Sequence, residues 1–254
     1  MIALSCPVFG QTPAQIEKEL VGHIKNIRKW SSYTNSYDEK MGADLYKENE
    51  TFKTKLLKHS KKLSTLKYKF AELNKYISIS TSDDNKFRIY SWDTETGGTM
   101  HNFENVYQFQ GKNGKAHSST SSDDDETGAG AFVSDIYTLD TKAGKVYLAR
   151  FSAILSTSLS YQSIDLFKIE NNSLNDKIKL FRTTSGLQNS IGFQYDFFSV
   201  VDRKERPIKL ILYDKQAKVI KIPVVIEDKK NPNGRVTNKF IVYRFNGTYF
   251  VKAS

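Results

Sequence analysis

The segment Lys86–Phe109 reads KFRIYSWDTETGGTMHNFENVYQF, with two strand-like runs around a Gly-Gly pair. Its first run alternates two sets of side chains, which are Phe87, Ile89 and Ser91 and, between them, Arg88, Tyr90 and Trp92. A period of two with aromatic and β-branched residues predicts a strand with two different faces. The residues DTETGG that follow favour a turn, because Asp bonds its own backbone and Gly permits positive φ. We therefore predict a hairpin that reverses near Gly97 and returns over residues 100–109.

A related pattern recurs 47 residues later, as YSWDTETG at Tyr90–Gly97 and YTLDTKAG at Tyr137–Gly144. A spacing in the forties is typical of one blade of a β-propeller. Repeat architectures normally need three copies, and this chain has two, so a common Asp-Thr-x-x-Gly hairpin connection used twice is the alternative. Both interpretations predict β-structure on either side of the two turns.

The composition is that of a globular protein with an unusual share of aromatic residues. The 254 residues are 39% hydrophobic and 26% charged, and no run approaches the ~18 apolar residues of a membrane span. The 14 Tyr and 16 Phe occur mainly after residue 76. Aromatic side chains pack well on a pleated surface, so this distribution favours β-structure in the larger, later part of the chain.

The first twelve residues, MIALSCPVFGQT, are apolar and are followed by a polar, charged stretch. This pattern is typical of the end of a secretory signal peptide cleaved before Gln11, although a basic start is missing. Acylation of Cys6 is an alternative, but Ala3 occupies a position where such signals usually carry Leu. Cys6 is the only cysteine, so a cleaved chain has no disulfide or cysteine nucleophile. We predict export to a bacterial periplasm or to the cell exterior.

Residues 13–76 are expected to be helical. Thr12 can cap a helix over residues 13–30, Pro13 suits its first turn, and apolar residues recur at helical spacing. A second helix is expected over residues 37–62 and a shorter third one over residues 66–76. The predicted organisation is a residual signal-like segment at 1–12, a helical segment at 13–76 and an antiparallel β domain at 77–254.

Positive charge is concentrated in the helical segment. Residues 13–76 carry 14 Lys+Arg against 8 Asp+Glu, net +6, and the rest of the chain carries 24 against 20, net +4. A lysine-rich helix can bind nucleic acid or an anionic membrane. A solvated helix face is favoured here, because arginine is scarce in the lysine cluster and no base-stacking motif accompanies it.

From Ile77 onward, about twelve short strand-like runs alternate with turn signals. Asn231–Gly234 and Asn246–Gly247 predict hairpin turns, and residues 110–131 are expected to form a loop. The acidic run Asp123–Glu126 in this loop lacks the ligand spacing of a calcium-binding EF-hand. Hairpin-length connections predict a mainly antiparallel α+β fold, either a two-sheet sandwich or a small propeller-like meander.

Standard catalytic and nucleotide-binding motifs are missing, so candidate site residues come from the opening segment. They are Tyr90, Trp92, Asp93, Glu95, His101 and Glu104. A carboxylate beside an imidazole can orient a general base, paired carboxylates can cleave a glycosidic bond, and both can bind a metal. Turn acids and a cross-strand histidine are also common in β proteins that have no active site. The run at Val201–Arg206 is expected to form a structural ion-pair network.

Taken together, these features predict an exported, non-enzymatic binding or interaction protein. Its partner is expected to be a protein or a glycan, and the net charge of +10 favours an acidic one. Nucleic acid is not an expected partner, no cofactor is expected, and the oligomeric state is open. The alternative is a hydrolase acting on a glycan or phosphoester, with Asp93 and His101 facing each other across the hairpin about 5 Å apart.

Overall fold

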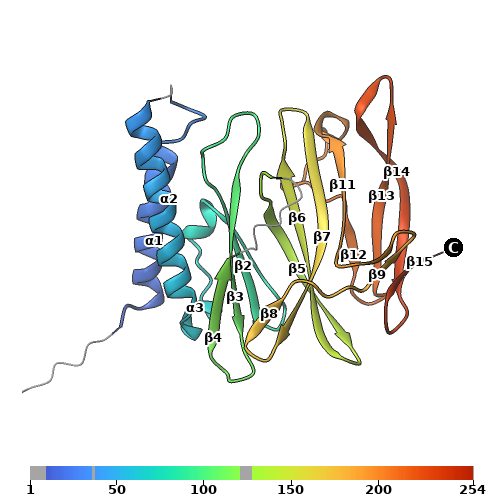
Figure 1. The fold of residues 1–254 in the computed structure, drawn as a ribbon, viewed down its shortest axis with the longest axis horizontal. Coiled ribbons are helices and arrows are strands. Elements are labelled where there is room, and N and C mark those ends of the chain that lie inside the picture. Colours follow the sequence, from blue (N-terminus) through green and yellow to red (C-terminus); the bar gives the residue numbers. More distant parts are fainter. Residues whose placement is uncertain (1–9, 36–37, 121–127, 254) are drawn as a thin grey trace, which may run out of the picture.

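The computed structural model describes residues 10–35, 38–120 and 128–253. Of these described residues, 44% are in strands and 22% are in helices. The layers run in the order helices, first sheet, second sheet and third sheet (Figure 1). The predicted α+β fold with a helical N-terminal segment and antiparallel sheets is confirmed. Stacked sheets correspond to the sandwich alternative and not to blades around a central axis. Residues 1–9 of the signal-like segment, and the acidic run Asp123–Glu126, lie outside the described residues.

The helical layer consists mainly of α1 (Pro13–Lys29) and α2 (Glu39–Ser60). At the start of α1, the Thr12 hydroxyl accepts a bond from the Gln15 N–H, and the Gln15 side chain accepts one from the Thr12 N–H. This capping box satisfies two main-chain donors that the first turn of a helix leaves without partners. Asp38 caps α2 in a similar way, with its carboxylate accepting from the Lys40 N–H at 2.8 Å.

The prediction of a third helix over residues 66–76 is wrong. The chain instead forms a short α3 (Leu63–Lys67), turns at Phe70 with a positive φ of 50°, and forms a 3₁₀ turn η1 (Leu73–Lys75). The buried Glu17 carboxylate of α1 accepts the main-chain N–H groups of Glu72 (2.8 Å) and Leu73 (3.0 Å). This side chain from another helix stabilises the tight turn, and residues 66–76 themselves contain no signal for it.

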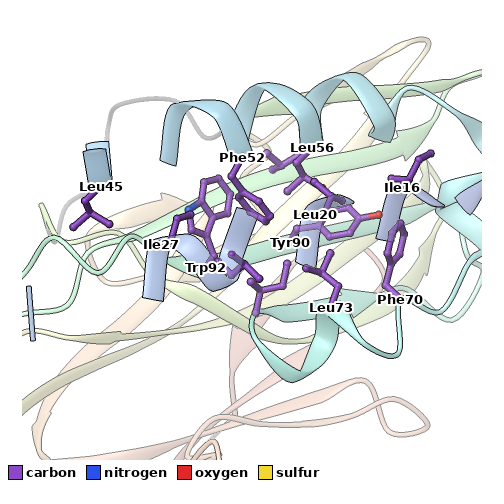
Figure 2. Packing of buried hydrophobic residues seen from close by; sticks show 13 residues of the cluster. Ile16, Leu20, Ile27, Leu45, Phe52, Leu56, Phe70, Leu73, Tyr90 and Trp92 are labelled. Carbon is purple, nitrogen blue, oxygen red and sulfur yellow. The ribbon is translucent and has the colours of Figure 1, made fainter. Parts of the chain in front are cut away.

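The first sheet has the order β1–β2–β3–β4 and packs against the helices. Its strands are β1 (Ser78–Thr81), β2 (Phe87–Asp93), β3 (Phe103–Gln110) and β4 (Ala116–Thr120). The apolar stripes of α1 and α2 meet Tyr90 and Trp92 of β2 in a common core (Figure 2). Complete burial of each large apolar side chain contributes about 1.5–3 kcal/mol, so this core joins the helical layer firmly to the sheet.

β2 is buried on both faces, which explains its two different sets of side chains. Tyr90 and Trp92 face the helices, whereas Phe87 and Ile89 belong to the core between the first and second sheets. Arg88 also points to the helices, where its Nη1 donates to main-chain oxygens of the segment that follows α2. The alternation predicted from the sequence therefore separates two cores.

The second sheet is the middle layer of the stack, with the order β11–β7–β6–β5. Its strands are β5 (Phe132–Thr141), β6 (Gly144–Ile154), β7 (Leu159–Glu170) and β11 (Ser190–Asp196), and β8 (Ser173–Asn175) pairs with β7. Eight consecutive residues of β6 are buried, because sheets cover both of its faces. The turn predicted at Lys142–Lys145 is a tight hairpin in which Thr141 pairs with Gly144.

The third sheet forms the outer layer, with the order β10–β9–β15–β14–β13–β12. Its strands are β9 (Phe181–Thr183), β10 (Gly186–Gln188), β12 (Leu212–Asp214), β13 (Val219–Asp228), β14 (Asn231–Phe245) and β15 (Phe250–Lys252). All of its pairs are antiparallel except β9 with β15. A 3₁₀ turn, η2 (Phe197–Val200), lies between β11 and this sheet.

Candidate functional site

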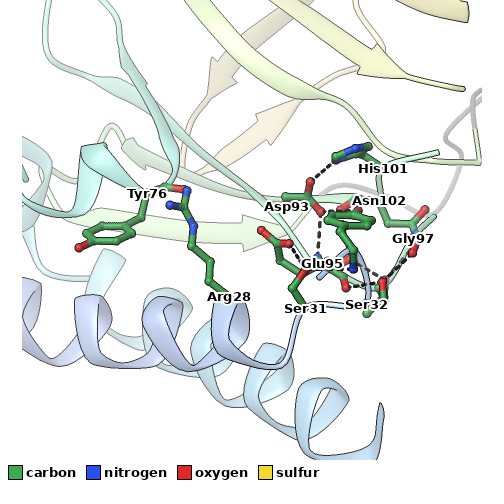
Figure 3. Close-up of polar contacts among 12 residues, drawn as sticks. Arg28, Ser31, Ser32, Tyr76, Asp93, Glu95, Gly97, His101 and Asn102 are labelled. Atoms are coloured by element: carbon green, nitrogen blue, oxygen red, sulfur yellow. Dashed lines mark hydrogen bonds and ion pairs between the residues drawn. The ribbon is translucent and has the colours of Figure 1, made fainter. Parts of the chain in front are cut away.

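Asp93, the last residue of β2, is the centre of a polar cluster (Figure 3). Its Oδ2 atom lies 2.5 Å from His101 Nδ1. Its Oδ1 atom accepts hydrogen bonds from the Tyr33 hydroxyl at 2.9 Å and from the Glu95 main-chain N–H at 2.8 Å. The carboxylate thus holds the imidazole through Nδ1, which is how a carboxylate orients a histidine that acts as a general base.

The segment that connects α1 to α2 is bonded to the same β2–β3 loop (Figure 3). Ser31 Oγ donates to Glu95 Oε2 at 2.6 Å, and Ser32 Oγ donates to the main-chain oxygen of Gly97 at 2.6 Å. Burial raises the pKa of the Glu95 carboxyl, and the bond from Ser31 opposes that shift. Glu95 has a positive φ of 59°, so the loop conformation and these bonds support each other. Through these hydrogen bonds the cluster connects the segment between α1 and α2 to the end of β2 and to the β2–β3 loop.

His101 reaches Asp93 from the loop and not from a paired strand position. Asp93 is paired with Phe103, so the connection spans residues 94–102 and is longer than the reversal predicted near Gly97. The His101 side chain is 31% exposed, and its ring packs against that of Tyr33 with centroids 4.4 Å apart. The structure therefore brings Asp93, Glu95 and His101 into one cluster. It also adds Tyr33, which no pattern in the sequence connects with these residues.

Tyr90 and Trp92 lie in the core between the helices and the first sheet (Figure 2). Their exposed fractions are 0% and 1%. The Tyr90 hydroxyl donates to Gln108 Oε1 at 2.8 Å, and Trp92 Nε1 donates to Asn49 Oδ1 at 3.0 Å. Both side chains have packing and hydrogen-bonding roles, and neither is accessible to a ligand.

Of the six predicted site residues, Glu104 is the one that lines a surface hollow. It belongs to β3, and its Oε2 atom lies 3.3 Å from the Nζ atom of Lys53 on α2. Lys53 Nζ is also 3.8 Å from Glu50 Oε1. Burial raises the pKa of the Glu104 carboxyl; Lys53 opposes this shift and the negative charge of Glu50 adds to it. A carboxyl with a raised pKa beside a hollow is a typical feature of a functional site.

The hollow has a volume of about 620 Å³ and lies between α2, β3 and the second sheet. Tyr46, Glu50 and Lys53 contribute one face of α2, since residues four and three apart lie side by side on a helix. Six aromatic residues take part in the lining, namely Tyr46, Phe103, Tyr107, Phe151, Tyr161 and Phe167. Among the described residues that line this hollow, neither Asp93 nor His101 is present.

The polar face of α2 is the part of the hollow that sequence reasoning missed. Tyr46, Glu50 and Lys53 have helical spacing and lie away from the apolar stripe of Phe52 and Leu56, which is a detectable pattern. The same pattern is typical of an ordinary solvated helix face. Only the packing of α2 across the first sheet places these side chains beside Glu104.

The residues around Val201–Arg206 have partners of a structural kind. Arg203 Nε donates to Glu205 Oε1 at 2.5 Å, and Arg206 Nη2 donates to the main-chain oxygen of Val201 at 3.1 Å. The expected ion-pair network is therefore present only as the single pair Arg203–Glu205, and Arg206 bonds main-chain oxygens instead of a carboxylate.

Neither a metal site nor a membrane-spanning helix is found in the described part of the chain. Among the described residues, no group of three or more His, Cys, Asp or Glu side chains is placed to hold a metal ion. Within the same ranges, no helix has the length and apolar character to cross a membrane. Comparisons with protein-family models, curated proteins and solved structures found no match.

Proposed function

We propose that the protein is a non-enzymatic binding protein and that the hollow beside Glu104 holds a glycan. The observation that carries this proposal is the position of Glu104, a partly buried carboxyl with a raised pKa in the wall of a hollow of about 620 Å³. Small-ligand sites in proteins commonly have volumes of about 300–1,000 Å³ and a few well-placed polar groups.

The lining suits the two kinds of surface that a sugar ring presents. Hydroxyl groups at the ring edge can donate to the carboxylates of Glu50 and Glu104, and the C–H faces of the ring can pack on aromatic side chains. Tyr46 stands at the rim with 68% of its side chain exposed. Phe103 lines the same hollow from β3. Aromatic and carboxylate groups on facing elements therefore support a glycan as the ligand.

Calorimetric titration with bacterial envelope oligosaccharides tests the proposal. Glu104→Gln keeps the shape of the side chain and removes its charge, so we expect the affinity for the best oligosaccharide to fall at least tenfold. Glu72→Gln is the matched control, because Glu72 also pairs with a lysine but its side chain is 62% exposed and does not line the hollow. We expect the control variant to bind like the wild type.

Two results would contradict the proposal. One is the absence of any oligosaccharide bound by the wild type, and the other is equal binding by the wild type and Glu104→Gln. Release of shorter sugars during a long incubation would show catalysis and would exclude a purely binding role.

A second candidate function, a hydrolase acting on a glycan or phosphoester, is favoured by the Asp93–His101 contact. The 2.5 Å contact to Nδ1 leaves Nε2 as the ring atom that would take a proton from water or a nucleophile. The position of both residues outside the hollow favours the binding role instead. A hydrolase panel decides between them: activity that disappears in a folded His101→Ala, Asp93→Asn double variant would support the hydrolase.

Export belongs to the same proposal and rests on the apolar first residues of the sequence. Fractionation of cells that express the full chain, followed by N-terminal sequencing, tests it. We expect a periplasmic or secreted product that begins at Gln11. A product confined to the cytoplasm with residues 1–10 intact would contradict export.

A further inference from the structure

A second concentration of positive charge, besides that of the helical segment, lies in the C-terminal part of the chain. Residues 201–254 carry 13 Lys+Arg against 5 Asp+Glu, net +8, whereas residues 77–200 carry 11 against 15, net −4. The C-terminal residues supply β12, β13, β14 and β15 of the third sheet. This sheet lies at the opposite end of the layer stack from the helices (Figure 1). The two basic parts of the chain therefore form two separate surfaces.

The strand register assigns side chains to the outer face of the third sheet. Directly opposed residues on paired strands share a face, and neighbours along a strand alternate. Ile220 and Tyr243 are opposed and belong to the core against the second sheet. The outer face therefore holds two adjoining rows, which are Leu212, Lys221 and Val242, and Asp214, Val219, Arg244, Val251 and Arg182.

Three cations of this face outnumber its one acid, Asp214, and form no ion pair among the described residues. They are Arg182, Lys221 and Arg244, and all three are exposed. Arg182 instead lies over the ring of Tyr249, with Cζ 4.6 Å from its centroid. A partner that brings carboxylates to this face would supply the missing counter-charges and would be attracted from a distance by the net charge.

A hollow with a mixed lining adjoins the same cations at the β12 edge, and its polar residues include Arg203, Lys209 and one acid, Asp202. It has a volume of about 180 Å³, and Leu212 and Phe240 line it with 41% and 42% of their side chains exposed. Phe240 is opposed to Pro223, two residues beyond Lys221 on β13, so the hollow continues the row that contains Lys221. Leu210, which is 2% exposed, also lines it. The hollow is of the size that one bulky aliphatic or aromatic side chain fills.

We propose that the outer face of the third sheet docks an acidic segment of another protein, with one bulky apolar side chain of that segment seated between Leu212 and Phe240. Cations without ion pairs, beside a hollow whose wall includes Leu210, Leu212 and Phe240, match a chain that alternates acidic and apolar side chains. A membrane surface fits less well, because the apolar side chains here line a concavity and are more than half covered. Membrane-binding surfaces instead present apolar side chains that project into the lipid.

Selection from a phage-displayed library of random twelve-residue peptides tests this proposal, with binding then measured by fluorescence anisotropy. We expect the selected peptides to be rich in Asp and Glu, to contain Leu or Phe, and to bind more weakly as salt rises. The double variant Lys221→Glu, Arg244→Glu should bind them at least tenfold more weakly. Leu212→Ser, which keeps every charge, should bind them at least fivefold more weakly.

Lys67→Glu, Lys69→Glu is the matched control, because it changes the net charge equally on exposed lysines of the helical layer. We expect it to lower the affinity less than threefold, with circular dichroism confirming that all variants are folded. The proposal is overturned if selection returns no peptides, if the peptides lack an acidic excess, or if both double variants weaken binding equally. Binding to anionic phosphatidylglycerol vesicles that Lys221→Glu, Arg244→Glu abolishes, without peptide binding, would assign the face to a membrane.

Discussion

Trp92 Nε1 donates a hydrogen bond of 3.0 Å to Asn49 Oδ1, which connects the end of β2 to the middle of α2. Asn49 Nδ2 in turn donates to the main-chain oxygens of Leu45 at 3.0 Å and Thr94 at 2.9 Å. Both side chains are buried, with exposed fractions of 1% for Trp92 and 4% for Asn49. One amide therefore satisfies polar groups from a strand, a helix and the β2–β3 loop inside the core that joins the two layers.

Replacing Asn49 tests how strongly this amide supports the helical layer. Asn49→Ala leaves Trp92 Nε1 and the Thr94 carbonyl buried without partners, so we expect the free energy of unfolding to fall by about 3 kcal/mol. Urea denaturation measures the change. In a Trp92→Phe background, which lacks the indole donor, the same substitution should cost about 1 kcal/mol less. An identical cost in both backgrounds would show that the Trp92–Asn49 bond contributes nothing.

Arg150 offers a second test, in the middle of the second sheet. Its side chain is 1% exposed, forms an ion pair with Asp135, and donates from Nη1 to the Ile211 carbonyl at 2.6 Å. Arg150→Met leaves the Ile211 carbonyl without this donor, while Asp135, which is 23% exposed, keeps Lys209 as a partner, so we expect a loss of about 2–3 kcal/mol in unfolding free energy. Arg203→Met, which breaks the exposed pair with Glu205, should change it by less than about 1 kcal/mol. Similar losses in the two variants would contradict the role assigned to burial.

The sequence predicted β2 well, and it did so because side-chain alternation is a local property. Phe87 and Ile89 were expected on one face and Tyr90 and Trp92 on the other, and each pair lies in its own core. Asp93 and His101 could be placed near each other because they flank one hairpin. Tyr33 could not, since it lies 60 residues before Asp93 and meets it only through the packing of helices on the sheet.

Two further predictions of secondary structure were wrong, and each has a physical cause in the hydrogen bonds of the segment. β4 (Ala116–Thr120) was expected to be loop because its sequence, AHSST, contains no large apolar residue, and pairing with β3 alone makes it a strand. Asn231–Gly234 was expected to be a turn but opens β14. The chain turns earlier because Asp228 Oδ1 accepts the main-chain N–H groups of Lys230 and Asn231.

Glu19 gives a prediction about pH. The bond from Lys55 lowers the pKa of the Glu19 carboxyl from 4.5 to about 2, and Gln11 adds to this shift while burial opposes it. Because the folded-state pKa lies below the unfolded value, the ionised carboxylate stabilises the fold above about pH 5, and this contribution is lost as the pH falls toward 2. We therefore expect Lys55→Met to lower the unfolding free energy by about 1–2 kcal/mol at pH 6 and by much less at pH 2.5.

Urea denaturation of both proteins between pH 2.5 and 6 measures this difference. Lys75→Met is the control, because Lys75 pairs with Glu72 on the surface, where both side chains are 62% exposed. Such exposed pairs contribute about 0–1 kcal/mol, so this variant should follow the wild type at every pH. A Lys55→Met difference that stays constant from pH 6 to 2.5 would mean that Lys55 acts through packing and not through the Glu19 charge.

Gly97 and Gly98 provide a matched pair of substitutions in the β2–β3 loop. A Cβ atom at Gly97 would lie 1.9 Å from the Met100 carbonyl oxygen, whereas a Cβ atom at Gly98 would meet nothing within 4 Å. Gly97→Ala must move the main chain of the loop that carries His101, so we expect a loss of about 2 kcal/mol in unfolding free energy and shifted NMR signals of the His101 imidazole. Gly98→Ala should change stability by less than about 0.5 kcal/mol and leave those signals in place. Equal effects of the two substitutions would mean that the loop has no fixed conformation, and the contact between Asp93 and His101 would then have no rigid support.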